Sequence, residues 1–78
     1  MQLHVKLFSR FREHLPREAR GKAIIELPGG ITVGHLLDHL GIVGRIQLIT
    51  VNGEPETDRT RLLEDGDRVH IFPFVVGG

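Results

Sequence analysis

The chain of 78 residues contains no cysteine, no tryptophan and no tyrosine. Without cysteine it can form neither a disulfide nor a thiolate metal site, and it has no cysteine nucleophile. It has no apolar run near the roughly 18 residues of a membrane-spanning helix, and its first residues alternate like a strand instead of forming a signal peptide. The formal net charge is +0, so no overall attraction favours nucleic acid or an anionic membrane. We therefore expect one small cytoplasmic domain that is stabilised by apolar packing and has no membrane partner.

Two segments in the first third of the chain alternate between apolar and polar residues, which is the period of a half-buried strand. The first covers residues 3–7, and the second covers residues 23–27 and ends at the turn signal Pro28-Gly29-Gly30. Residues 9–15, between the two, can form a short helical turn. The pattern predicts two strands that are joined as a loose hairpin.

The period then changes to that of an amphipathic helix. Apolar residues recur along one face of residues 33–40. Thr32 is a suitable N-cap, and Gly41 lies where a glycine ends many helices. We expect one helix with a single apolar face.

Strand-like patterns return after the helix. Residues 47–51 form an apolar segment that ends at Asn52-Gly53, a tight-turn dipeptide. Residues 54–67 are polar and loop-like, with room for one short strand or helical turn, and residues 68–72 alternate as a final strand. This order of elements favours an α+β fold in which a small mixed sheet packs on one main helix.

The charged side chains are distributed unevenly although they sum to zero. Residues 1–22 hold six basic side chains against two acidic ones, whereas residues 51–70 hold six acidic against three basic. Such a distribution can steer a protein onto a partner, or it can be ordinary solvated surface.

Outward-facing residues on the first and last strands are candidates for a docking surface. If Val69 and Ile71 face the helix, the residues that follow each of them face away from it. That places His70 and Phe72 on the outward side, and Phe8 has the same parity on the first strand. An exposed group of Phe8, His70 and Phe72 would suit a protein partner. The alternative is that Phe8 or Phe72 packs at the edge of the core.

Several patterns that resemble other kinds of site are better explained as structure. His35 and His39 lie one helical turn apart, but no third ligand has a suitable spacing, so we expect a solvated helix face and no metal site. The glycines before the helix lack the lysine and hydroxyl residue of a phosphate loop. Asp65 and Asp67 lie in a turn without the rest of a calcium loop. No nucleophile is paired with a base, so we expect no catalytic residue and no enzyme.

The chain ends in Val75-Val76-Gly77-Gly78, directly after the final strand and Pro73. We expect residues 1–73 to form the domain and residues 74–78 to form a flexible tail. About five extended residues reach roughly 15 Å, and glycine has no Cβ, so the end of the tail can enter a narrow channel. Its terminal carboxylate can attack an activated phosphate.

One ordered series of motifs occupies the last third of the chain. The series is Val51-Asn52-Gly53-Glu54, Leu62-Leu63-Glu64-Asp65-Gly66-Asp67-Arg68-Val69, Phe72-Pro73 and Gly77-Gly78. Together with the predicted order of elements, it resembles the MoaD/ThiS family of ubiquitin-like sulfur carriers. The length and the Phe72-Pro73 pair favour the MoaD-like branch over the ThiS-like branch.

The resemblance implies a β-grasp fold and a role as a sulfur carrier. A MoeB/ThiF-type activating enzyme would use ATP and Mg²⁺ to join the terminal carboxylate of Gly78 to AMP, and a sulfur donor would convert the adenylate to a thiocarboxylate. The carrier would bind no cofactor and would be the substrate of this enzyme. The tail residues Phe74, Val75, Val76 and Gly77 would thread into the partner.

The MoaD-like branch implies molybdopterin (molybdenum cofactor) biosynthesis, in which a MoaE-like synthase subunit would accept the sulfur and this chain would be the small subunit of the complex. Thiamin synthesis and tRNA thiolation are alternative pathways, and a ubiquitin-like modifier joined to lysines through Gly78 would use the same activation. A further alternative is a β-grasp module that binds protein or RNA without covalent chemistry, through residues 10–22. That segment lacks alternating basic and aromatic residues, so we do not expect nucleic acid as the partner.

Overall fold

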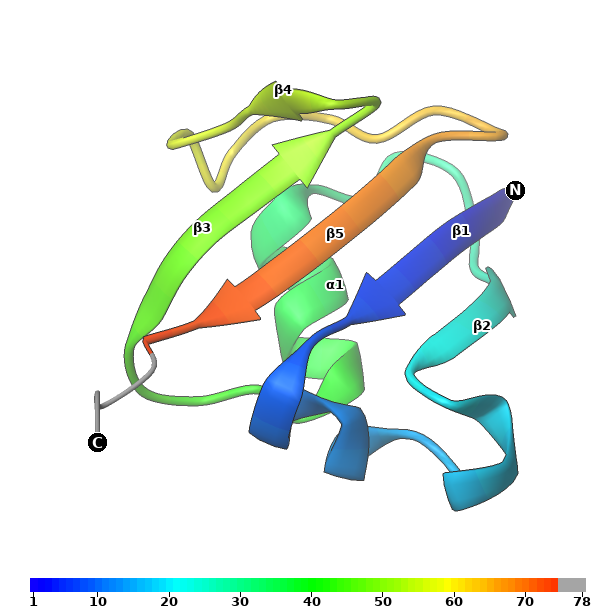
Figure 1. Ribbon diagram of the computed structural model, residues 1–78. Helices are drawn as coiled ribbons and strands as arrows, with labels where there is room; N and C mark the ends of the chain where they lie inside the picture. Colours follow the sequence, from blue (N-terminus) through cyan, green and yellow to red (C-terminus); the bar gives the residue numbers. More distant parts are fainter. Residues whose placement is uncertain (75–78) are drawn as a thin grey trace.

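The computed structural model describes residues 1–74, which form one five-stranded mixed sheet with an α-helix on one face (Figure 1). The strands are β1 (Gln2–Leu7), β2 (Lys22–Glu26), β3 (Ile46–Val51), β4 (Glu54–Pro55) and β5 (Arg68–Pro73), and the helix is α1 (Val33–Leu40). Two 3-10 helices, η1 (Ser9–His14) and η2 (Arg17–Ala19), connect β1 to β2. The predicted α+β fold, a small mixed sheet packed on one main helix, is confirmed.

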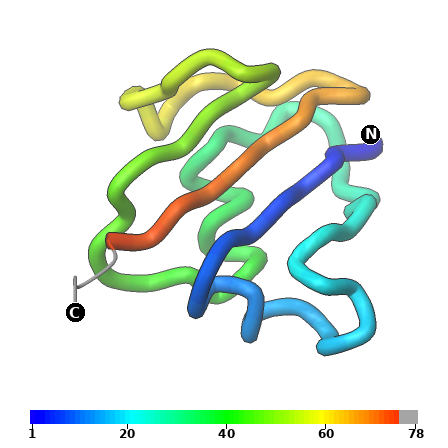
Figure 2. The backbone as a smooth tube through the Cα atoms, in the orientation of Figure 1, coloured from blue at the N-terminus to red at the C-terminus, as the bar shows by residue number. Residues whose placement is uncertain are grey.

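The strand order is β2-β1-β5-β3-β4, so the first and last strands of the chain lie side by side in the middle of the sheet (Figure 2). β1 and β5 run parallel, and every other neighbouring pair is antiparallel. β1 and β2 pair from Gln2 opposite Glu26 to Lys6 opposite Lys22, which confirms the loose hairpin. β5 therefore joins the β1–β2 pair to the β3–β4 pair in one sheet.

The two central strands each turn one face toward α1 and the other away from it. Leu3, Val5 and Leu7 of β1 are buried, and so are Val69 and Ile71 of β5, as the period of two requires. We call the sheet face opposite α1 the outer face. Val69 and Ile71 thus face the helix, which is the condition on which the proposed outward position of His70 and Phe72 depends.

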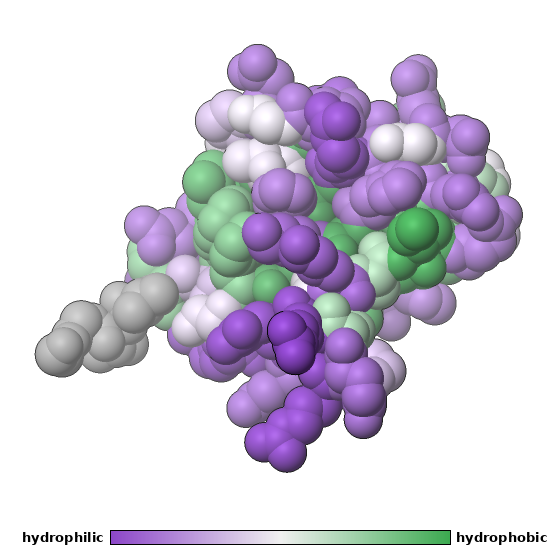
Figure 3. All heavy atoms as spheres, turned by 45° about the vertical axis from the view of Figure 1, so that its right-hand side comes forward, coloured by the Kyte–Doolittle hydropathy of each residue, from purple (hydrophilic) through white to green (hydrophobic). Residues whose placement is uncertain are grey.

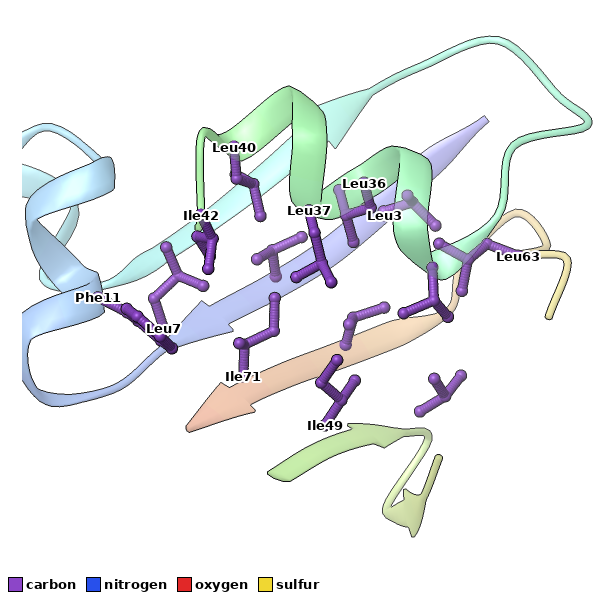
Figure 4. Packing of buried hydrophobic residues seen from close by; sticks show 14 residues of the cluster. Leu3, Leu7, Phe11, Leu36, Leu37, Leu40, Ile42, Ile49, Leu63 and Ile71 are labelled. Carbon is purple, nitrogen blue, oxygen red and sulfur yellow. The ribbon is translucent and has the colours of Figure 1, made fainter. Parts of the chain in front are cut away.

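The core lies between α1 and the inner face of the sheet (Figure 4). Leu36 and Leu37 project from the helix onto β1 and β5, and Leu63 covers the core from the loop before β5. A fully buried leucine contributes about 1.5–3 kcal/mol of burial free energy. Leu36 is 0% exposed, so this helix face is a main source of the stability of a domain without disulfides.

The helix begins and ends where the sequence predicts. The Thr32 hydroxyl accepts a hydrogen bond from the His35 amide at 3.2 Å, and the Thr32 amide donates to His35 Nδ1 at 3.1 Å. This reciprocal pair is a capping box in which histidine replaces the usual Glu or Gln. Gly41 closes the helix with φ of 74°, in the left-handed region that favours glycine.

The connection between β1 and β2 is held against the sheet by one aromatic side chain and one glycine. Phe11 of η1 is 4% exposed and enters the core beside Leu7 (Figure 4). The Leu7 amide donates to the Gly21 carbonyl at 2.7 Å, and a Cβ on Gly21 would lie 2.5 Å from the Leu7 carbonyl oxygen. This contact fixes the position of the arginine-rich segment relative to the end of β1.

Small differences from the predicted boundaries have local causes. β5 continues through Pro73, which pairs with Ile46. Proline has no amide hydrogen to donate to a neighbouring strand, and this is tolerated because Pro73 is the last residue of β5. Residues 54–67 contain the short strand β4 and an isolated bridge between Thr32 and Leu62. Among residues 1–74, no helix is long and apolar enough to cross a membrane.

Candidate functional site

Three side chains on the outer face form a compact group, which we call the aromatic patch: Phe8, His70 and Phe72. The rings of Phe8 and Phe72 stack with centroids 4.1 Å apart and an interplanar angle of 15°. The His70 ring lies 5.8 Å from Phe8 and 6.5 Å from Phe72. All three are half-buried and stand outside the core cluster. The structure thus brings together the residues that the sequence named for docking, and their role in docking stays a prediction.

The parallel pairing of β1 with β5 creates this patch. The register sets Lys6 beside His70 and Leu7 beside Ile71, and the Phe8 amide donates to the Ile71 carbonyl at 3.3 Å. One residue further along each strand, Phe8 and Phe72 therefore meet on the outer face. Leu48 pairs with Phe72 from β3 and is 39% exposed, which extends the apolar surface.

Basic side chains border the aromatic patch. The Lys6 ammonium lies 4.9 Å from the centre of the Phe8 ring, within the range of a cation–π contact. Lys6 also lies directly opposite Lys22 across the β1–β2 pair, although like charges in that position repel one another. These residues, with Arg68, help to line a shallow hollow of about 520 Å³ on the outer face. An acidic partner surface would relieve this repulsion.

Burial lowers the pKa of His70 below its usual value of 6.5, and the nearby charges of Lys6 and Arg68 lower it further. The lowered pKa favours the neutral imidazole of His70, which can donate or accept a hydrogen bond. The aromatic patch therefore combines two apolar rings with one polar ring.

The C-terminal segment leaves the sheet between two arginines. Nη1 of Arg10 donates to the carbonyl oxygen of Phe74 at 2.6 Å, and the guanidinium of Arg45 lies 5.3 Å from the centre of the Phe74 ring. Arg10 belongs to η1 and Arg45 to the loop before β3, so the two reach Phe74 from separate parts of the fold. Val75, Val76, Gly77 and Gly78 lie outside the described residues. The boundary between a domain of residues 1–73 and a tail of residues 74–78 stays a prediction.

Two parts of the motif series, the turns that contain Asn52 and Asp67, have a structural role at the other end of the sheet. Asp67 is 7% exposed and accepts hydrogen bonds from Asn52 Nδ2 at 2.9 Å and from the Glu64 amide at 2.8 Å. Asn52 also accepts from the Arg68 amide at 2.8 Å, while its own amide donates to the Arg68 carbonyl at 2.7 Å. The side chains of Asn52 and Asp67 thus join the β3–β4 turn to the start of β5.

The other candidate sites have structural explanations. His35 is part of the cap of α1, a role that the sequence pattern did not predict because capping boxes usually have Glu or Gln at this position. Within residues 1–74, no three His, Cys, Asp or Glu side chains are arranged to hold a metal ion. The contacts of Arg10 and Arg45 with Phe74 were also missed. The abundance of arginine before Gly21 was a signal for Arg10, and no sequence pattern singled out Arg45.

These features define a class of protein: a ubiquitin-like β-grasp domain whose central last strand leads into the C-terminal segment. The sequence profile of the ThiS family matches residues 5–78, so the chain belongs to the ThiS family. This confirms the resemblance to the ubiquitin-like MoaD/ThiS sulfur carriers. No curated protein matches the chain.

Solved structures share the fold over almost the whole chain. Small archaeal modifier protein 1 (SAMP1) from Haloferax volcanii has a TM-score of 0.75 and 24% identity, with 100% of both chains covered. A candidate molybdopterin converting factor, subunit 1, from Pyrococcus furiosus has a TM-score of 0.73 and 29% identity over 96% of this chain and 99% of that chain. A chain from the complex of subunits 1 and 2 of the molybdopterin-converting factor from Helicobacter pylori has a TM-score of 0.67 and 21% identity, with 100% of both chains covered. Proteins of this family are small carrier subunits, in agreement with the expectation of a carrier.

Proposed function

We propose that the chain is a sulfur carrier whose terminal carboxylate, on Gly78, is adenylated and then converted to a thiocarboxylate. The observation that carries the proposal is the match to the ThiS family through residue 78, on a fold whose central strand β5 leads directly into that segment. The family match supports the choice of Gly78, which lies outside the described residues.

This chemistry consists of two nucleophilic attacks, the first at phosphorus and the second at carbon. A carboxylate oxygen of Gly78 attacks the α-phosphorus of ATP and releases pyrophosphate. A hydrosulfide equivalent from the sulfur donor then attacks the acyl carbon, forms the carbon–sulfur bond and releases AMP. A MoeB/ThiF-type activating enzyme in the cytoplasm would hold ATP and Mg²⁺. This chain contributes the carboxylate and a tail narrow enough to deliver it.

The aromatic patch is the docking surface in this proposal. Phe8, His70 and Phe72 would anchor the partner protein, and residues 74–77 would thread into it with their backbone extended. Half-buried aromatic rings are suited to this role because they present a large rigid surface and lose little conformational freedom on binding.

Molybdopterin synthesis is the pathway that we propose. The supporting observation is the similarity, at 29% identity, to the candidate molybdopterin converting factor subunit 1 of Pyrococcus furiosus. A MoaE-like subunit would then receive the tail, in an assembly like the complex of subunits 1 and 2 from Helicobacter pylori.

The test is intact mass spectrometry of the full chain after incubation with the activating enzyme, ATP, Mg²⁺ and a sulfur donor. We expect a mass increase equal to the difference between one sulfur and one oxygen atom, located in the C-terminal peptide. Deletion of Gly78, or addition of one alanine after it, should abolish the increase and leave the unfolding curve unchanged. An unchanged mass for the native chain, or normal activation of the extended chain without trimming, would refute the proposal.

A role as a protein modifier is the second candidate, since SAMP1 has the same fold. Both roles begin with the adenylate. Conjugates of higher mass in cell extract, linked from Gly78 to lysine side chains, would support the modifier role. Persistence of the thiocarboxylate without conjugates would support the carrier role alone.

A further inference from the structure

The connection between β1 and β2 contains an open hollow of about 920 Å³, which we call the arginine hollow. Four arginines line it: Arg10, Arg12, Arg17 and Arg20. All four side chains are exposed, and Glu13 is the one acidic residue among the lining. Figure 3 shows strongly hydrophilic residues gathered at this lower end of the molecule. The hollow is therefore a concentrated cationic surface.

Within residues 1–74, none of the four arginines forms an ion pair, and Glu13 balances only one of their four charges. Among residues 1–74 the ion pairs are Met1 with Glu26 and Arg61 with Glu56, and neither includes an arginine of the hollow. The acid-rich residues 54–67 lie at the opposite end of the sheet (Figure 1). Like charges that face one hollow repel one another, so an anion bound between them would be favoured by electrostatic attraction.

The hollow lies beside the root of the C-terminal segment. Arg10 lines the hollow and also donates to the Phe74 carbonyl, while Arg45 contacts the Phe74 ring from another part of the fold. A protein that contacts Phe74 would therefore come close to Arg10, at one side of the arginine hollow. The same partner would lie along the aromatic patch, since β5 leads from Phe72 to Phe74.

The side chains favour carboxylates over nucleic acid as the ligand. Guanidinium groups bind carboxylates and phosphates alike through two parallel hydrogen bonds, so a surface with several arginines suits a segment rich in Asp and Glu, and the discrimination rests on the other lining residues. No aromatic residue is among the lining residues of the hollow, so it offers no surface on which bases could stack.

We propose that the arginine hollow binds an acidic segment of the activating enzyme, next to the entrance through which that enzyme receives the tail. This inference rests on the proposed function. It adds a second contact region to the aromatic patch and assigns the uneven charge of the chain to partner recognition. Charge pairs at such a rim mainly raise the rate and salt sensitivity of association.

Steady-state adenylation of the full chain tests the inference, with pyrophosphate release as the readout and the carrier as the varied substrate. The variants are Arg17→Glu and Arg20→Glu, and the matched control is Arg59→Glu, which makes the same charge change in the acidic half of the chain. Each hollow variant should raise KM about three- to tenfold and change kcat less than about twofold. The control should change both less than about twofold. The increase in KM should shrink at high salt because ions screen exposed charges.

The outcomes separate the inference from the proposed function. If the native chain is not adenylated at all, the proposed function is wrong. If it is adenylated and the hollow variants have the same KM as Arg59→Glu, the arginine hollow is not a docking site. A further experiment measures the binding of a fluorescent single-stranded RNA by anisotropy, to test nucleic acid as the alternative ligand of the hollow. If Arg17→Glu abolishes RNA binding but leaves KM unchanged, nucleic acid is the ligand and the inference is overturned. Thermal unfolding of each variant confirms that these exposed substitutions leave the fold intact.

Discussion

Truncation of Phe72 separates a docking role of the aromatic patch from a purely structural one. Phe72→Ala removes a stacked pair whose ring centroids are 4.1 Å apart, and such a pair contributes about 0.5–1.5 kcal/mol beyond its buried area. The half-buried ring adds about 1 kcal/mol from burial. We therefore expect the free energy of unfolding to fall by about 1.5–2.5 kcal/mol.

The variant should still be folded at 25 °C. A domain of 78 residues has a typical free energy of unfolding of about 4–12 kcal/mol. Even if only about 1.4 kcal/mol remained, less than about a tenth of the molecules would be unfolded, and the apparent Kd for a partner would rise by only about a tenth. Lost folding therefore cannot account for a large loss of binding.

A docking role predicts a much larger effect on binding. Removal of an aromatic anchor at the centre of an interface typically costs at least about 2 kcal/mol, which is about a 30-fold increase in Kd. The assay is isothermal titration of the activating enzyme with native and Phe72→Ala chains, alongside urea unfolding of each.

Leu62→Ala is the matched control, because Leu62 is 61% exposed, lies in the loop between β4 and β5 and belongs to neither the aromatic patch nor the core cluster. We expect it to change Kd less than about twofold, since apolar residues outside an anchor usually contribute little to binding. A Kd for Phe72→Ala no larger than that of Leu62→Ala would refute the docking role. A fall in unfolding free energy well above about 3 kcal/mol would show that the ring is part of the core.

Two further predictions concern stability. Asp67→Ala leaves the Asn52 amide group and the Glu64 amide without their acceptor, so urea unfolding should show a loss of about 2–4 kcal/mol. A loss below about 1 kcal/mol would mean that water replaces both bonds. Because burial holds the pKa of His70 below 6.5, the unfolded chain binds a proton more readily than the folded one. Stability should be intact above about pH 6.5 and decline as the pH falls below it. His70→Gln should lose less stability between about pH 7.5 and about pH 5.5 than the native chain, and an equal loss would contradict this assignment.

Local patterns were sufficient to predict the helix and the orientation of the strands. The apolar face of residues 33–40, with Thr32 before it and Gly41 after it, determines α1 through neighbours a few residues apart. The outward position of Phe72 follows from the period of two in β5, because a shift by one residue would expose Val69 and Ile71.

The assembled site depends on contacts between distant parts of the chain. The stack of Phe8 on Phe72 requires the parallel pairing of β1 with β5, which no alternation pattern within a single strand specifies. The contacts of Arg10 and Arg45 with Phe74 require the η1 segment and the loop before β3 to meet at one end of the sheet. Irregular segments have no period from which such positions can be inferred.

Two parts of the family motif, the turns that contain Asn52 and Asp67, lie at the end of the sheet opposite Phe74. Their side chains hold the β3–β4 turn to the start of β5, so these parts of the motif maintain the fold. Phe74 lies beyond the other end of β5, between Arg10 and Arg45. A chain can therefore keep the motif and the fold while different side chains at the tail end select different partners. We therefore expect charge-reversal substitutions in the arginine hollow to change which activating enzyme the chain prefers, and with it the choice among molybdopterin synthesis, other sulfur transfer and protein modification. If such substitutions leave this preference unchanged, the aromatic patch must select the enzyme instead.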